Sequence, residues 1–106
     1  MKALPESLIK YHKAGRPLEA DLGEGLPGWL QLWPLSEIGE RNQAYEVDQQ
    51  APGYTGIGSN GGGEMLALSP SGQVVVVPFV GMEPRVAIVV ADSWETFESR
   101  IKSRSA

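Results

Sequence analysis

The sequence predicts a small α+β domain in which a mostly antiparallel or mixed sheet of about four to six strands is flanked by N-terminal, middle and C-terminal helices. Three observations predict this fold class. Short apolar runs separated by Gly- and Pro-rich turns follow one another over residues 52–91, as in a strand meander. Segments with apolar residues three or four positions apart precede and follow these runs, which indicates helices. The 106 residues suit a single domain over residues 1–106.

The first predicted element is a helix that begins near Pro5, a residue that the first turn of a helix tolerates. Leu4, Leu8 and Tyr11 share one face of this helix, and Gly15 ends it. Residues 16–28 show no clear periodicity, so we expect an ordered loop or short turns there.

A short strand is predicted at residues 28–33, where Leu30 and Leu32 alternate with Trp29 and Trp33. Pro34 ends this strand.

A middle helix of about three turns is predicted to follow, with Ser36 as its N-cap. Gly39 disfavours this helix by roughly 1 kcal/mol. Its sparse inner stripe comprises Leu35, Ile38, Asn42 and Tyr45.

Four further strands are predicted at residues 54–58, 64–69, 73–80 and 85–91. The β-branched run in the third of them indicates burial on both faces. A C-terminal helix follows, capped by Asp92 or Ser93. Its apolar stripe consists of Trp94, Phe97 and Ile101.

The net charge of −4 is unevenly distributed, because residues 19–48 contain seven carboxylates and a single arginine. Such an acidic middle is unsuited to nucleic acid, which needs a basic face, and suits a basic protein partner. The alternative is a solvated surface without a partner. The sequence has no cysteine, no apolar run long enough to span a membrane and no signal-like start, so we expect a cytoplasmic protein that does not enter a membrane.

The stretch TGIGSNGGGEMLAL raises the question of a phosphate-binding loop. Residues 56–61 match G-x-G-x-x-G, but a strand-like pattern follows where the dinucleotide motif requires a helix. Residues 58–63 fit the start of a P-loop, but Glu64 and Met65 replace its Lys and Ser/Thr. We therefore interpret the loop as a turn in which Asn60-Gly61 reverses the chain and the next glycines bulge or pass close to a side chain such as a tryptophan. The alternative is a backbone surface that contacts a partner. The residues of this structural loop are Gly58, Asn60, Gly61, Gly62, Gly63 and Glu64.

Catalytic chemistry finds little support in the remaining residues. His12 is the single histidine, and we expect it on a solvated helix face. Glu37 and Glu40 can share a face of the middle helix, where solvation is the simplest role. The sequence thus gives no candidate catalytic, cofactor-binding or metal-binding residue.

Four motifs in order resemble the SUKH superfamily, which includes the Smi/Knr cell-wall assembly regulators. The first is LWPLSEI at residues 32–38, and the second is the pair Asn42 and Tyr45 after it. The third is IGSNGGGE at residues 57–64, and the fourth is ADSWETF at residues 91–97. The resemblance covers residues 29–102. Residues 4–15 are similar to the family's second helix, which implies a short form that lacks the usual first helix.

The resemblance implies a mixed sheet wrapped by helices, no catalytic machinery and a role in binding other proteins. Bacterial members are similar to immunity proteins that each neutralise a toxin domain, often a nuclease. On this basis we expect a toxin-neutralising domain that acts by occlusion, as a monomer or weak homo-oligomer. The alternatives are a scaffold domain, including one that self-associates through a strand edge or apolar patch, and a small-ligand binder or unrecognised enzyme. The candidate partner-binding residues are Asp21, Glu24, Trp29, Glu37, Glu40, Glu46, Asp48 and Tyr54.

Overall fold

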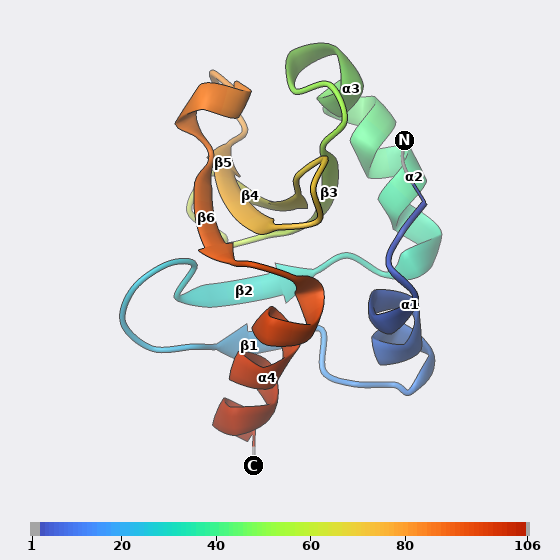
Figure 1. Cartoon of the computed structure of the whole chain (residues 1–106), viewed down its shortest axis with the longest axis vertical. Coiled ribbons are helices and arrows are strands. Elements are labelled where there is room, and N and C mark those ends of the chain that lie inside the picture. The colour runs from blue at the N-terminus through green and yellow to red at the C-terminus, as the bar shows by residue number, and fades with distance from the viewer. Residues whose placement is uncertain (1–2, 106) are drawn as a thin grey trace.

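The computed structural model describes residues 3–105, and it describes side chains up to Ile101. Six antiparallel strands form one curled sheet in chain order, and helices pack on both of its faces (Figure 1). This arrangement confirms the predicted α+β class. The elements are α1 (Glu6–Lys13), β1 (Glu19–Asp21), β2 (Trp29–Leu32), α2 (Leu35–Ala44), α3 (Val47–Gln50), β3 (Thr55–Ser59), β4 (Glu64–Leu68), β5 (Val74–Pro78), the 3₁₀ turn η1 (Pro84–Val86), β6 (Ile88–Ala91) and α4 (Trp94–Ser105).

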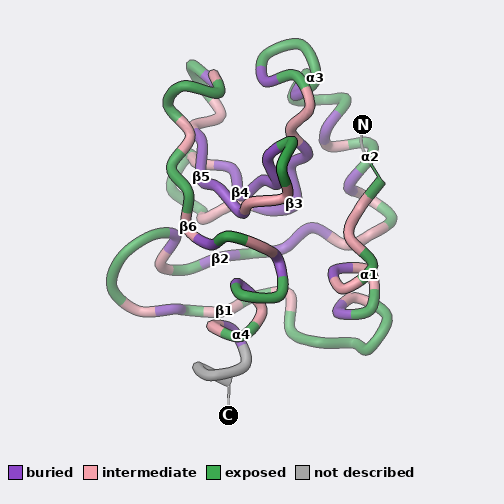
Figure 2. The backbone as a smooth tube through the Cα atoms, viewed as in Figure 1, coloured by how far each residue is buried: buried purple, intermediate pink, exposed green. Residues whose placement is uncertain are grey.

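The central strands are buried on both faces, as the β-branched run predicts. In β4 and β5 the side chains alternate between two hydrophobic cores: Leu66 and Val76 belong to the first, and Met65 and Val75 to the second. Figure 2 shows this burial concentrated in the middle of the sheet.

The first core lies between the sheet, α1 and α4. Trp94, Phe97 and Ile101 are all at most 1% exposed, so the predicted stripe of the C-terminal helix is confirmed. This helix contacts both edge strands, β1 and β6. Ser7 of α1 donates a hydrogen bond to Glu95 of α4 (2.7 Å), which joins the two helices on this face. The second core is covered by α2 and α3.

Three local predictions need correction. Residues 19–21 form β1 inside the expected loop. Its three residues, Glu-Ala-Asp, are too few for an alternation to be recognised, and the strand is stabilised by pairing with β2. Pro34, not Ser36, occupies the N-cap of α2, and Ser36 lies inside its first turn. The last predicted strand begins only at Ile88, since residues 84–86 turn as η1.

Two helix ends also become clear. Glu46 adopts a left-handed conformation (φ 56°), so the middle helix divides into α2 and α3. At the C-terminal helix, Ser93 accepts a hydrogen bond from the Thr96 amide (3.2 Å) and is therefore the capping residue of the two that were predicted.

Candidate protein-interaction surface

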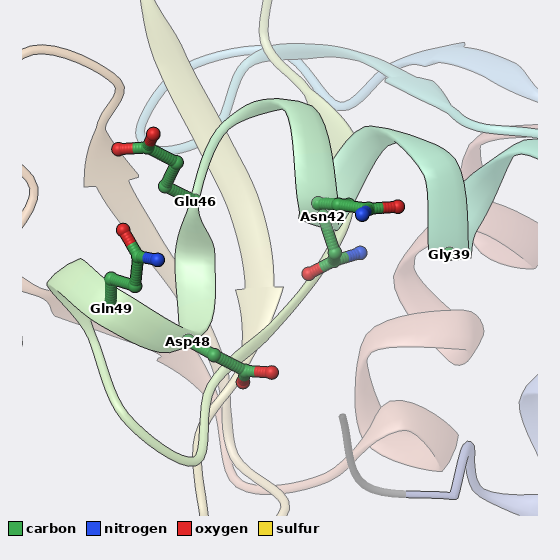
Figure 3. Close-up of a pocket in the computed structure, with 6 residues that line it drawn as sticks. Gly39, Asn42, Glu46, Asp48 and Gln49 are labelled. Carbon is green, nitrogen blue, oxygen red and sulfur yellow. The ribbon is translucent and has the colours of Figure 1, made fainter.

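An acidic corner is formed where α2 turns into α3. Its three exposed carboxylates, Glu40, Glu46 and Asp48, are called the acidic shoulder below. Beside them is a hollow of about 340 Å³, lined by Gly39, Asn42, Gln43, Glu46, Asp48 and Gln49. In Figure 3 the carboxylates of Glu46 and Asp48 point apart. The shoulder therefore spreads negative charge over a surface and does not gather it on one small ligand.

The predicted candidate Glu37 differs from these three. Its carboxylate accepts two hydrogen bonds from Arg41, at 3.1 Å from Nε and 3.0 Å from Nη2. The Arg41 guanidinium in turn lies over the Trp33 ring, 5.4 Å from its centroid. Glu37 is thus neutralised by a cation of its own helix and contributes little to the field of the shoulder.

On the other side of α2 lies an aromatic groove of about 350 Å³. The Tyr45 ring stacks on Trp33, with centroids 5.8 Å apart, and contacts Phe79 at 4.6 Å. Tyr45 is 37% exposed, whereas Trp33 is only 4% exposed. The groove is lined by Leu18, Glu19, Gln31, Leu32, Trp33, Pro34, Glu37, Arg41, Tyr45, Ser59 and Phe79. It offers a partner a rigid aromatic surface with polar groups along its sides.

Asp21, Glu24 and Trp29 lie elsewhere, on the β1–β2 hairpin, which is on a different side of the molecule from the α2–α3 corner (Figure 1). Asp21 is the direct cross-strand partner of Trp29. Tyr54, the remaining candidate, is half-buried against the second core. The structure therefore divides the predicted candidates into a group on α2–α3, a group on the hairpin and one largely internal tyrosine.

The glycine loop connects β3 to β4 and is organised by Asn60. The Asn60 carboxamide accepts from the Gly62 amide (2.9 Å) and donates to the Glu64 carboxylate (2.8 Å). Gly61 has a φ of +75°, and a Cβ added there would lie 2.8 Å from the Trp29 ring. A tryptophan thus packs against the loop, at Gly61 instead of at the following glycines. Gly58 lies inside β3, where a Cβ would come within 2.4 Å of the Gln31 carbonyl oxygen.

The environment of His12 differs from the solvated face expected for it. His12 is half-buried, and its Nε2 is buried with no hydrogen-bond partner among the described residues. Burial lowers the pKa of this imidazole. The side chain lines a hollow of about 480 Å³ together with Lys13, Arg16 and Leu18. This hollow adjoins the aromatic groove, because Leu18 and Pro34 line both.

Within the described residues there is no group of three or more His, Asp or Glu side chains that could hold a metal ion. No helix in that same part of the chain is long and apolar enough to cross a bilayer.

Sequence reasoning missed the aromatic groove, although it placed two of its members in motifs. Trp33 belongs to the LWP junction. Tyr45 was expected on the inner stripe of the middle helix, but it is the C-cap of α2 and is 37% exposed. Phe79 comes from the end of β5, distant in the sequence, so only the tertiary fold brings it to Tyr45. A run of helix residues four apart (Glu37, Arg41, Tyr45) was the available signal for this side of α2.

These features define a small α+β domain with a charged shoulder and an aromatic groove on opposite sides of one helix. The model of the SMI1 / KNR4 family (SUKH-1) matches residues 2–100, so the chain belongs to this family. A comparison with curated proteins gives no significant match.

Proposed function

We propose that this protein is a non-enzymatic immunity protein, which binds a basic toxin domain in the bacterial cytoplasm and neutralises it by covering its active surface. The observation that carries the proposal is the match to the SMI1 / KNR4 family (SUKH-1) over residues 2–100. Domains of this family are generally immunity proteins and not enzymes.

The α2 surface supplies the contacts for such a partner. Glu40, Glu46 and Asp48 are exposed, so they attract a cationic surface at long range and speed the encounter. The groove on the other side of α2 supplies Tyr45, an exposed aromatic side chain held by its stacking on Trp33. Rigid aromatic anchors of this kind often dominate binding energy. Charge thus guides the partner to α2, and the groove retains it.

Co-expression tests the proposal directly. The toxin domain encoded next to this protein's gene is expressed in a bacterial host with and without the protein, and growth is measured. We expect growth to be restored and the two proteins to elute as one complex. If the neighbouring gene product is toxic and this protein neither binds it nor restores growth, the immunity assignment is wrong.

The contribution of the acidic shoulder is tested by charge reversal. Glu40→Lys is compared with Glu6→Lys, which makes the same change in net charge on the exposed face of α1. The shoulder variant should slow association several-fold at low salt, whereas the α1 variant should slow it much less. Equal association rates would show that the shoulder does not steer the partner.

The second candidate function is a scaffold domain that binds other proteins, or its own copies, without a toxin. The exposed apolar edge of β6 favours this candidate. Size measurement and the identity of the neighbouring gene product distinguish it from the immunity protein.

A further inference from the structure

One edge of the sheet is open and apolar. β6 is the last strand in the sheet order, and among the described residues it pairs only with β5. Ile88 is 50% exposed and Val89 is 48% exposed. Figure 2 shows the exposed stretch running along this edge of the sheet.

The two exposed side chains lie on opposite faces of the sheet. Ile88 is opposite Val76, which belongs to the first core, and Val89 is opposite Val75, which belongs to the second. The strand therefore exposes one large apolar side chain on each face of the sheet. Another strand placed alongside β6 would bury apolar area on both faces of the sheet while it satisfies the edge amides and carbonyls.

The opposite edge of the sheet shows the usual protection. β1 has only three residues, and its exposed Glu19 and Asp21 place two carboxylates on the edge. Charges, short length and prolines are the common means by which edge strands avoid pairing. Residues 86–91, VAIVVA, contain no charged residue, no proline and no other polar side chain. β6 is also short, with four residues, and its register with β5 shifts between Val74 and Val75. Its exposed apolar side chains nevertheless make it the better suited of the two edges to pair with another strand.

The charges at the two ends of this segment favour a second copy as the occupant. Arg85 precedes the apolar segment and Asp92 follows it, and both are exposed. Antiparallel pairing about a twofold axis brings Arg85 of one copy near Asp92 of the other, and it does so at both ends. In the single chain Arg85 forms an ion pair with Glu83. The Arg85 side chain is still 81% exposed, so it remains accessible to a second copy.

We propose that two copies of this chain associate through β6, with their strands antiparallel and their sheets joined into one. Ile88 and Val89 are the apolar centre of this interface, and the Arg85–Asp92 pairs close its two ends. The proposal does not depend on the toxin-neutralising function, because no residue of the acidic shoulder belongs to this interface.

Sedimentation velocity over a concentration series up to about 1 mM tests the association. We expect the wild-type protein to shift from monomer to dimer as concentration rises. Val89→Lys should raise the dimer dissociation constant at least about tenfold, because a lysine on an edge strand opposes pairing. The matched control is Val80→Lys, at a valine that is 91% exposed and lies outside the strand. This control should leave the association unchanged.

A charge swap decides whether the second copy is arranged as proposed. Arg85→Asp and Asp92→Arg should each weaken the dimer, and the double variant should restore it towards the wild-type dissociation constant. Far-UV circular dichroism checks that every variant is folded. A wild-type protein that stays monomeric throughout the series overturns the proposal, as does a dimer that Val89→Lys leaves intact. Failure of the double variant to recover overturns the antiparallel arrangement.

Discussion

Removal of the Asn42 carboxamide is expected to be among the most damaging single changes outside the apolar cores. Asn42 is only 8% exposed. Its Nδ2 donates to the carbonyls of Ile38 (2.7 Å) and Gly56 (2.9 Å), and its Oδ1 accepts from the Gly56 amide (2.7 Å). β2 pairs with β3 at Gly58 and Ser59, and the Trp33 amide donates to the Ile57 carbonyl (2.9 Å). At the next residue, Gly56, the Asn42 side chain takes the place that a neighbouring strand would have.

Asn42→Ala leaves both backbone groups of Gly56 buried without their partner. Each such group costs about 1–3 kcal/mol, so we expect a loss of about 2–6 kcal/mol in the free energy of unfolding. This is a large share of the roughly 5–15 kcal/mol that stabilises a typical domain. Urea unfolding followed by tryptophan fluorescence measures it, because Trp33 and Trp94 are buried.

The control for this prediction is Gln43→Ala, at the exposed next residue of α2, which should change stability by less than about 0.5 kcal/mol. Asn42→Asp keeps the acceptor but, when ionised, cannot donate. Its folded-state pKa should therefore be raised, and its stability should increase as the pH is lowered. A loss below about 1 kcal/mol in Asn42→Ala would refute the view that this side chain replaces a strand partner.

Three further predictions concern single positions. Gly63→Ala, at φ +88° with open space around it, should lower the free energy of unfolding by about 1–2 kcal/mol because of the left-handed backbone. Gly61→Ala should lower it more, because the added Cβ meets Trp29. Equal losses in urea unfolding would contradict that contact. Glu46→Gly should raise the urea midpoint slightly, since it relieves about 1 kcal/mol of left-handed strain at φ 56°, and a lower midpoint would mean that the side chain itself is needed. The lowered pKa of His12 should make stability fall as pH decreases below about 6.5, because the unfolded chain then binds the proton more readily, and His12→Gln should flatten this part of the urea-derived pH profile.

The sequence was informative where the signal was local. The α4 stripe, the Asn60-Gly61 turn and the buried valine run of β5 each depend on residues close together in the chain, and all three are present in the structure. β1 escaped prediction because its three residues, Glu-Ala-Asp, become a strand only through pairing with β2.

The surface features depend on long-range contacts. No periodicity connects Phe79 with Tyr45, and no motif indicates that the Asn42 carboxamide reaches across to Gly56. The acidic residues were visible as composition, but their division between α2–α3 and the β1–β2 hairpin, and the neutralisation of Glu37 by Arg41, follow only from the folded arrangement.

The position of α4 between the two edge strands has a consequence for biosynthesis. The β3–β4–β5 meander joins neighbouring segments, so it can pair soon after it leaves the ribosome. The first core cannot close at that time, because α1 and β1 pack against Trp94, Phe97 and Ile101, which are translated after all six strands. During that interval the nascent chain exposes Leu8, Leu30 and their neighbours, and chaperones that recognise apolar segments would find their substrate there.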